Sequence, residues 1–528
     1  MVESYPTSDW ELFDTQKEAL SELKEHRQGF FSIGVGGGKT LLAMLAAKVL
    51  DIDPADTLIL SLAELRDEAA FEWEKYKEHF DVPWSEFVSY TFISRNEKYF
   101  WEKKPKLIIA DECHKLKRKQ SNRTHFFIRY MREHPGTIFV PMSGTITTRS
   151  ITEYAHLLYL ALGDDCPLPN PNSSVGWPRI QSLARVLDSR PTQEPTQSDY
   201  RIAGYILDPR PDEGWREAFL RVLNSAPGVY LNEGVTFDGP ISVQPWKPEI
   251  PDDVKQDIKK VKSSAQMPNE EWVSGATEQA QKVKQLSQGF YYYPIWKDCH
   301  TPEWRRAKRA KDELVSSKIR SEKRKKWGRI TRSRVENAFE QDIFTDPVWN
   351  HWEQFKDVPE PEREIQWQSE EILEQALDFC AELGGGTLLW YLHRAVRDKL
   401  ESVLDSRGGR WYDSDVVVVP RGEAPPRGDG KPDISVVSIR SHSTGLNLQH
   451  DYNKNVILLP PSNGGAWEQL LGRTHRPGQT EEVRAYYNAS LPVFRWCFTK
   501  AKRDARYVEE TIEQKQRLLL AEKCHEDG

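Results

Sequence analysis

The sequence predicts an α/β protein with two parallel-sheet lobes separated by a mainly helical insertion. Two stretches, 10–165 and 376–500, alternate short apolar runs with helical segments, which is typical of a parallel sheet covered by helices on both faces. The chain between them differs in character, since 251–380 is rich in Lys, Glu, Gln and Trp. We therefore expect a first lobe, a partly basic insertion, a second lobe and a C-terminal helix, over residues 1–165, 166–375, 376–500 and 501–528.

The strands of both lobes are predicted from short apolar runs that polar or turn residues bound on each side. In the first lobe these runs are 30–33, 57–60, 106–110 and 137–140. Helical segments such as 41–50 and 64–76 lie between them. In the second lobe the runs are 387–390, 415–419, 434–439, 456–459 and 483–487. Strands that alternate with helices are joined by crossovers, and so they favour a parallel sheet.

Composition excludes several classes of protein. The 73 Lys and Arg against 80 Asp and Glu give 73 − 80 = −7, which excludes a uniformly basic surface, so any polyanion must bind to local patches. A mean hydropathy of −0.67 and the lack of an apolar run near the roughly 20 residues of a membrane span argue against membrane insertion. The N-terminus lacks a basic start and an apolar core, and the six cysteines are scattered without a CxxC pair. We expect a protein that is not secreted and that works in a reducing cell interior.

The insertion contains a strongly basic stretch. Residues 303–334 hold 14 Lys or Arg against 4 Asp or Glu, a balance of 14 − 4 = +10, and Trp304, Trp327 and Trp349 lie within or near it. One interpretation is a solvated charged helix whose tryptophans pack inward. The other is a contact with a nucleic-acid backbone, where cations displace condensed counterions. The candidate contact residues are the run Lys323, Arg324, Lys325 and Lys326.

A candidate phosphate-binding loop lies between the run 30–33 and the helix 41–50. It consists of Gly36, Gly37, Gly38, Lys39 and Thr40. Glycines let backbone N–H groups wrap phosphates, Lys39 would reach the terminal phosphates, and Thr40 could bind Mg²⁺. The full GxxxxGK[ST] pattern is not met, since Ile33 stands at its first glycine position. A glycine-rich turn without a function is the alternative interpretation.

An acidic pair, Asp111 and Glu112, follows the run 106–110. The carboxyl end of a buried parallel strand is where α/β sheets bind ligands. Asp111 would hold Mg²⁺ and Glu112 would polarise an attacking water. Acidic residues also cap helices, so the pair has a purely structural alternative. The segment Ser143-Gly144-Thr145 after the run 137–140 is, by itself, most simply a turn.

The second lobe carries the most informative segment, which runs from Gln469 through Arg473 and Arg476 to Gln479. The two arginines are three residues apart and would share one face of a helix. Arginines that reach a triphosphate act as arginine fingers. A basic helix end at the surface is the alternative. Gly445 and Asn447, which follow the run 434–439, are candidate backbone contacts to a nucleotide or nucleic acid.

Taken together, these segments resemble those of the superfamily 2 helicase-like ATPases, and within them the SWI/SNF-type DNA translocases. The resemblance covers about 1–160 and 380–490, and the Gly-Arg-x-His-Arg-x-Gly-Gln segment that contains Arg473 is its most specific part. Gln16 is similar to the adenine-reading glutamine of that family. Ser61, and Ser89 with Tyr90, resemble segments that contact the nucleic acid. In that family the first glycine is not required, so the loop of Lys39 also matches.

The resemblance implies two RecA-like lobes and a nucleic-acid-dependent ATP hydrolase. ATP would lie between the lobes, with Mg²⁺ held by Thr40 and Asp111, catalysis by Lys39 and Glu112, and Gln469, Arg473 and Arg476 supplied by the second lobe. The partner would be DNA, most simply duplex DNA along which the protein moves. Likeness to compact phage and bacterial members implies a bacterial or phage-infected host cytoplasm.

Other interpretations of the same segments stay open. The same ATPase parts serve a helicase that separates DNA or RNA strands. They also serve the motor subunit of a nuclease or defence complex, whose nuclease would have to be a partner protein. The last alternative is an adaptor that binds ATP or DNA without catalysis.

Overall fold

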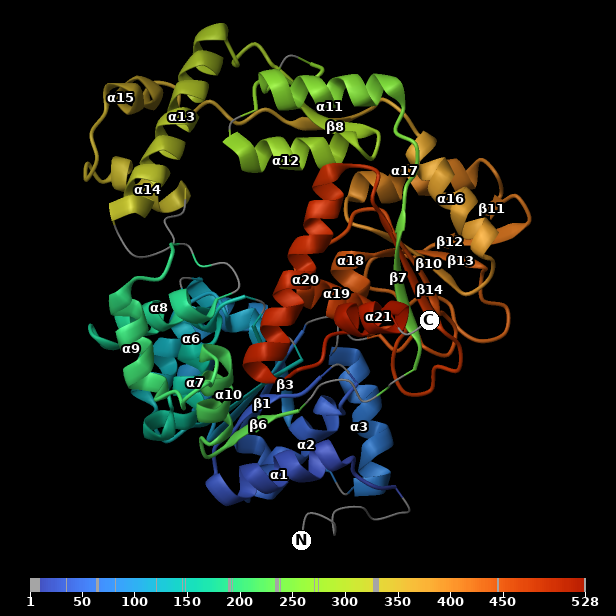
Figure 1. Ribbon diagram of the computed structural model, residues 1–528. Coiled ribbons are helices and arrows are strands. Elements are labelled where there is room, and N and C mark those ends of the chain that lie inside the picture. The colour runs from blue at the N-terminus through green and yellow to red at the C-terminus, as the bar shows by residue number, and fades with distance from the viewer. Residues whose placement is uncertain are drawn as a thin grey trace. The chain divides into compact units, whose positions relative to one another are not determined.

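The structure is a computed structural model of the 528-residue chain (Figure 1). It describes residues 10–34, 36–62, 66–80, 82–119, 121–144, 146–147, 149–188, 191, 193–232, 237, 239–269, 271–273, 275–325, 332–443 and 446–526. The chain divides into two compact units. The first comprises Met1–Trp246, Cys380–Leu392 and Leu404–Gly528, and the second comprises Lys247–Phe379 and His393–Val403.

The first lobe, in the first unit, is built on a sheet of six parallel strands in the order β3-β2-β4-β5-β1-β6. The strands are β1 (Phe30–Ser32), β2 (Thr57–Ser61), β3 (Glu86–Ser89), β4 (Leu107–Asp111), β5 (Ile138–Ser143) and β6 (Val229–Leu231). Four of them lie where apolar runs predict strands. The apolar runs predicted from the sequence do not include β3 and β6.

Side chains of this sheet alternate between two buried clusters, one on each face. In β4, Ile108 and Ala110 belong to one cluster and Leu107 and Ile109 to the other. Because successive side chains of a strand point to opposite faces, the sheet is buried on both sides. The helices of this lobe are α1 (Asp14–His26), α2 (Lys39–Leu50), α3 (Arg66–Phe80), α4 (Tyr90–Arg95), α5 (Glu97–Lys103), α6 (Asn122–Glu133), α7 (Ala155–Leu162), α8 (Gly176–Leu187), α9 (Gln197–Leu207) and α10 (Trp215–Asn224).

The second lobe is built on a seven-stranded sheet in the order β11-β12-β13-β10-β14-β15-β7. Its pairs are parallel except for β11 with β12. The strands are β7 (Ile241–Trp246), β10 (Thr387–Tyr391), β11 (Arg410–Trp411), β12 (Ser414–Val418), β13 (Ile434–Ser438), β14 (Lys454–Ile457) and β15 (Val483–Asn488). The helices α18 (Ile439–His442), α19 (Gly464–Leu471), α20 (Pro492–Ile512) and α21 (Arg517–Glu526) complete the lobe. The predicted class, α/β with two largely parallel sheets, is confirmed.

The boundary expected at residue 166 is wrong. Strand β6 pairs with β1 of the first sheet, and β7 pairs with β15 of the second, so the chain up to Trp246 belongs with the two sheets. Helices α8 and α10 bury Ile180, Leu183 and Phe219 in a core cluster of the first lobe. Residues 167–178 and 189–198 are rich in Pro, Ser, Asn, Thr and Gln, a composition typical of loops, and this placed the expected boundary at residue 166. Such segments do not prevent the helices next to them from packing on the sheet.

The C-terminal segment forms two helices, α20 and α21, rather than the single helix expected over 501–528. Helix α20, red in Figure 1, packs against both α19 and α10. Its Ala501 and Ala505 lie in the core of the second lobe, whereas Tyr507 and Ile512 lie in a core cluster of the first. One helix therefore contributes to the cores of both lobes.

The second unit is mainly helical, as the sequence predicts for the insertion. Its elements are α11 (Asp252–Ser264), α12 (Gly275–Leu286), β8 (Phe290–Pro294), α13 (Pro302–Lys325), α14 (Arg332–Glu340), α15 (Pro347–Glu353) and β9 (Arg363–Trp367), with parts of α16 (Glu371–Leu383) and α17 (Arg394–Asp405). Strands β8 and β9 form an antiparallel pair.

Tryptophans on α13 and α15 form the small cores of this unit. Trp304, Trp349 and Trp352 are buried, with 1%, 5% and 6% of their surface exposed. The ammonium of Lys311 lies 4.9 Å from the Trp352 ring centroid and 5.4 Å from that of Trp349, so cations of the basic helix cover these rings. The inward-packing interpretation is therefore confirmed for Trp304 and Trp349, and Trp327 lies outside the described residues.

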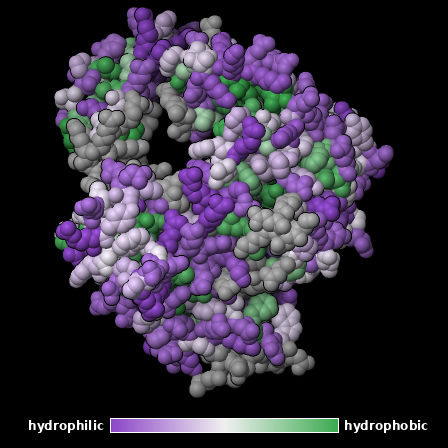
Figure 2. All heavy atoms as spheres, in the orientation of Figure 1, coloured by the Kyte–Doolittle hydropathy of each residue, from purple (hydrophilic) through white to green (hydrophobic). Residues whose placement is uncertain are grey.

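Among the described residues, no helix combines the length and the apolar character that crossing a bilayer requires. On the face shown in Figure 2, hydrophobic residues occur in small separate areas among hydrophilic ones.

The pairing of β7 with β15 predicts that Ile241 supports the second lobe. Ile241 is 1% exposed and lies in the core of that lobe. We expect Ile241→Ala to lower the free energy of unfolding by about 2–5 kcal/mol, because the buried side chain leaves a cavity. Urea unfolding followed by tryptophan fluorescence measures the loss. Gln244→Ala, on the same strand but half-buried, serves as the control, and equal stabilities of the two variants would contradict the placement of β7.

Candidate functional site

The loop between β1 and α2, hereafter the glycine loop (residues 33–38), places Lys39 at the first position of α2. Gly36 and Gly38 have φ values of 94° and 72°, which side chains other than glycine rarely adopt. Lys39 Nζ donates hydrogen bonds to the carbonyl oxygens of Ile33 at 3.2 Å and Gly34 at 3.0 Å. The lysine therefore folds back over its own loop. The next residue, Thr40, is half-buried in the first turn of α2.

Gln16 of α1 holds the end of the glycine loop. The Gln16 side chain is 3% exposed, its Nε2 donates to the Gly38 carbonyl at 3.0 Å, and its Oε1 accepts from the Phe13 backbone N–H at 2.9 Å. A Cβ atom added to Gly38 would lie 2.2 Å from Gln16 Nε2, closer than any real contact allows. The predicted Gln16 and Gly38 thus meet at one point. Gly37 is also restricted, since a Cβ there would lie 2.6 Å from Ile33.

The acid pair, Asp111 and Glu112, lies at the carboxyl end of β4. The Oδ1 atom of Asp111 is buried and accepts no hydrogen bond from the described residues. Burial, together with the charge of Glu112, raises the pKa of Asp111 to about 7, although Lys39 opposes this shift. A buried carboxylate oxygen that lacks a hydrogen-bond donor is suited to a cation ligand.

The pKa of Glu112 is shifted in the direction opposite to that of Asp111. Its backbone has φ of 57°, a left-handed conformation, and its Oε2 accepts from Ser143 Oγ at 2.9 Å and lies 3.0 Å from His114 Nδ1. Burial alone would raise the pKa of Glu112, but His114, Lys39 and Ser143 hold it below its ordinary range. Glu112 is therefore anionic at neutral pH and can accept a hydrogen bond from a water molecule.

Ser143, at the end of β5, is the partner of Glu112 that the sequence interpretation missed. The turn interpretation gave Ser143 no role, yet β5 lies next to β4 in the sheet and carries the hydroxyl to the acid pair. Strand order across a sheet is a long-range property, so no local signal could have revealed this contact.

Three residues expected to contact nucleic acid have different surroundings. Tyr90 is 2% exposed and its hydroxyl donates to the Asp111 carbonyl at 2.6 Å, which corrects the expectation of a surface contact there. Ser61 is also buried, at 5%. Ser89 is half-buried and caps α4 by accepting the Phe92 N–H at 3.2 Å. Of the three, Ser89 alone has a partly exposed position.

In the second lobe, the arginine segment (residues 472–479) follows α19. Arg473 is 4% exposed and donates to the carbonyl oxygens of Gln469 at 3.0 Å and Leu446 at 2.9 Å. Arg476 is 8% exposed and donates to Asn447 Oδ1. The predicted Gln469, Arg473, Arg476 and Asn447 are thus brought together, with Asn447 exposed beside them. Gly445 lies outside the described residues.

A buried polar chain fastens the arginine segment to the second sheet. Trp390 Nε1 donates to Asn455 Oδ1 at 3.0 Å, and Asn455 Nδ2 donates to Thr474 Oγ1 at 3.1 Å. Gln479 Nε2 donates to the Tyr452 carbonyl at 3.1 Å. All of these side chains are buried, so the segment is held by bonds that water does not weaken.

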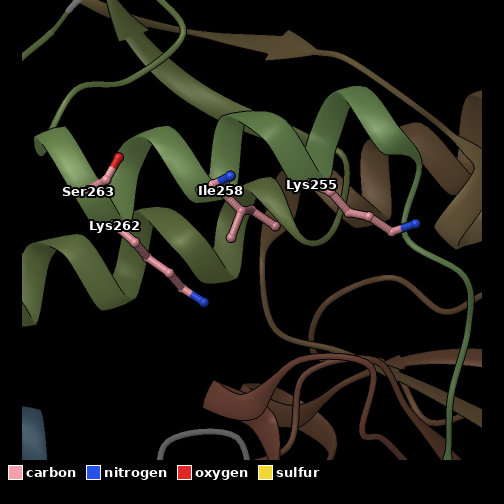
Figure 3. Close-up of a pocket in the computed structure, with 5 residues that line it drawn as sticks. Lys255, Ile258, Lys262 and Ser263 are labelled. Carbon is pink, nitrogen blue, oxygen red and sulfur yellow. The ribbon is translucent and has the colours of Figure 1, made fainter.

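The basic run of the insertion can be located only in part. The backbones of Lys323, Arg324 and Lys325 end α13, while their side chains and all of Lys326 lie outside the described residues. Another basic surface lies on α11, where a hollow of about 460 Å³ is lined by Lys255, Ile258, Lys259, Lys262 and Ser263 (Figure 3). Lysines at these spacings share one helix face, which makes this face cationic.

The donor set of the acid pair fits Mg²⁺. Among the residues that the structure describes, there is no cluster of three or more His, Cys, Asp or Glu that could hold a metal ion. Mg²⁺ keeps several waters and is bound through one or two protein oxygens together with substrate phosphates, so a site of this kind needs no such cluster. Soft metals that need several His or Cys ligands do not fit.

No protein-family model matches the chain, and a search of curated proteins finds no match.

Buried His156 of α7 predicts a pH dependence of stability. Its Nε2 lies 2.9 Å from the carbonyl oxygen of Leu116, just after the acid pair, and burial lowers the pKa of His156 to about 4. Unfolded histidine takes up a proton near pH 6.5, whereas the folded protein resists protonation until about pH 4, so stability falls as the pH drops through this window. We expect this histidine to contribute a loss of about 2 kcal/mol between pH 7 and pH 5.

Urea unfolding of the wild type and His156→Gln at both pH values measures this contribution. The amide of glutamine can still donate to Leu116 but does not titrate, so the variant should lose less stability on acidification. Equal losses in the two proteins would contradict the assignment.

Proposed function

We propose that the protein is a nucleic-acid-dependent ATP hydrolase that moves along duplex DNA, with two RecA-like lobes. The observation that carries the proposal is the meeting of a phosphate-type glycine loop and an acid pair at one edge of a parallel sheet. Lys39 follows β1, Glu112 follows β4, and the charge of Lys39 acts on both carboxylates. Phosphoryl transfer requires a lysine that follows a phosphate-binding loop and carboxylates at a strand end, and this edge of the sheet carries them.

The first lobe would bind and orient ATP. Backbone N–H groups of the glycine loop and the N-terminus of α2 face the phosphates, and Lys39 exchanges its two carbonyl partners for phosphate oxygens. Gln16 sits against Gly38, which suits it to read a base next to the loop. Asp111 and Thr40 would hold Mg²⁺, which would neutralise developing phosphate charge.

Glu112 would position the attacking water. Its carboxylate is ionised, so it can accept a hydrogen bond from the water. The contacts with Ser143 and His114 fix the orientation of the carboxylate. Ser143 also lies 3.2 Å from His114 Nδ1, so the three side chains form one connected group. A substitution of Ser143 at the end of β5 would therefore alter the position of the Glu112 carboxylate.

The second lobe would supply Arg473 and Arg476 to the triphosphate. Both arginines are bonded to neighbouring loop atoms, and the buried chain through Asn455 fixes the backbone between them. Placement of the arginines against ATP would then require the two lobes to approach each other, and hydrolysis would release them. Cycles of this kind convert ATP turnover into stepping.

Two observations support duplex DNA as the polymer along which the protein moves. The arginine segment resembles that of DNA translocases, and residues 303–334 carry a net charge of 14 − 4 = +10.

The decisive experiment compares ATP hydrolysis without nucleic acid and with single-stranded DNA, duplex DNA and RNA. Greatest stimulation by duplex DNA supports the proposal. Displacement of a triplex strand without unwinding of a duplex separates translocation from strand separation.

Two substitutions test the ATP site. We expect Lys39→Ala and Glu112→Gln each to lower kcat by at least about a hundredfold, because each removes charge stabilisation at the phosphates or the water. DNA binding should survive in both, since neither residue lies at a predicted DNA contact. Lys106→Ala, which removes an exposed lysine of the same lobe, is the control. Wild-type turnover in Lys39→Ala would refute the site.

A second prediction concerns the basic run. Neutralising Lys323, Arg324, Lys325 and Lys326 together should weaken DNA binding and reduce the slope of log affinity against log salt by about 0.9 for each lost phosphate contact. Binding titrations between low and moderate salt measure the slope. Neutralising four exposed lysines of the first lobe, Lys24, Lys98, Lys104 and Lys106, controls for net charge. An unchanged slope in the four-residue variant would mean that the run is solvated.

A further inference from the structure

A buried ion pair joins the C-terminal helix α21 to α19. Arg517 is 0% exposed and Glu468 is 3% exposed. The guanidinium NH1 of Arg517 donates to Glu468 Oε1, and the backbone N–H of Arg517 donates to Glu468 Oε2 at 2.8 Å. Because Arg517 is the first residue of α21, the Glu468 carboxylate also caps that helix.

The same guanidinium reaches the arginine segment. Arg517 Nε donates to the His475 carbonyl oxygen at 3.0 Å, and His475 stands between Arg473 and Arg476. Glu468 is adjacent to Gln469, whose carbonyl accepts from Arg473 Nε at 3.0 Å. One arginine therefore bonds to residues on both sides of Arg473, the first of the two predicted arginine fingers.

A second bond fixes the ring of the same histidine. His475 is 0% exposed, its Nε2 lies 2.8 Å from the Gly239 carbonyl oxygen, and its ring packs against Phe237 with centroids 5.0 Å apart. The backbone of His475 is thus held by Arg517 on one side while its ring is held by the segment before β7 on the other. Burying two opposite charges is costly unless the remaining N–H groups of the arginine also find hydrogen-bond acceptors. Here the Nε–H of Arg517 bonds to the His475 carbonyl oxygen in the arginine segment.

We propose that Arg517, held by Glu468, is a positioning residue for Arg473 and Arg476 in ATP hydrolysis. This role rests on the proposed function. Arg517 does not touch the substrate; it sets the backbone from which the two arginines project. The planar fork of Arg517 binds Glu468 and His475 at once, which a lysine cannot do in the same geometry.

The first arm of the test is the kinetics of Arg517→Lys, which keeps the charge partner of Glu468 but loses the fork. We expect kcat to fall by about tenfold to a hundredfold with KM for ATP within about twofold, because a small misplacement of a catalytic group is enough for such a loss. Glu522→Gln removes an ion-pair acceptor of the same helix, paired with Lys502 away from the arginine segment, and should keep wild-type kinetics. Unchanged kcat per folded molecule in Arg517→Lys overturns the proposal.

The second arm does not depend on catalysis. Amide hydrogen exchange of the peptide covering 472–479 should become faster in Arg517→Lys and stay unchanged in Glu522→Gln, while a β10 peptide over 387–391 is unaffected in both. Unchanged exchange over 472–479 overturns the positioning role. A wild-type protein that shows no ATP hydrolysis overturns the proposed function instead, and the exchange result then still reports whether Arg517 holds the segment.

A paired variant covers the case in which Arg517→Lys fails to fold. Arg517→Met combined with Glu468→Met replaces the ion pair with apolar side chains, a change that buried pairs often tolerate. The double variant should fold, with its thermal midpoint near that of the wild type, yet keep the low kcat, since the His475 carbonyl has lost its donor. Wild-type kcat in the folded double variant overturns the proposal.

Discussion

Parallel pairing of strands that are buried on both faces is the constraint on which the candidate site depends. Because β1, β4 and β5 run in the same direction, the residues after each of them emerge at one edge of the sheet. The glycine loop, the acid pair and Ser143 reach that edge from segments spread over about 110 residues of the chain. The alternation of apolar side chains into two clusters fixes this register, since a slip by one residue would exchange the side chains that pack on the two faces.

Burial at that edge gives the two neighbouring carboxyl groups different properties. Asp111 has a raised pKa and a buried oxygen that accepts no hydrogen bond from the described residues, whereas Glu112 has a lowered pKa because His114 and Ser143 hydrogen-bond its carboxylate. Two adjacent acids could not both be ionised cheaply in a water-poor site without such a division. The division suits Asp111 to a cation and Glu112 to a water. Tyr90, buried against the Asp111 carbonyl, keeps this turn in place.

In the second lobe, the arginine segment is held by polar groups that are far from it in sequence. Asn455 comes from β14, Trp390 from β10 and Arg517 from α21, and all three are buried. Each bond fixes backbone or side-chain atoms next to Arg473 and Arg476. The sequence of the segment itself does not reveal these bonds, because their partners are distant in the chain. In the insertion, by contrast, the tryptophans of the basic stretch supply small cores covered by lysines, so part of its charge lies over packed rings.

The sequence by itself determined the α/β class, most strands of both sheets and the loop, acid pair and arginine segment, because hydrophobic periodicity and short glycine or charged motifs are local properties. Tertiary structure alone decided that β6 and β7 join the two sheets, that Ser143 meets Glu112, and that Arg517 holds His475. It also decided that Tyr90 is buried rather than exposed. These features depend on which strands become neighbours and on which polar groups are buried together, and both follow from packing between segments that are distant in the chain.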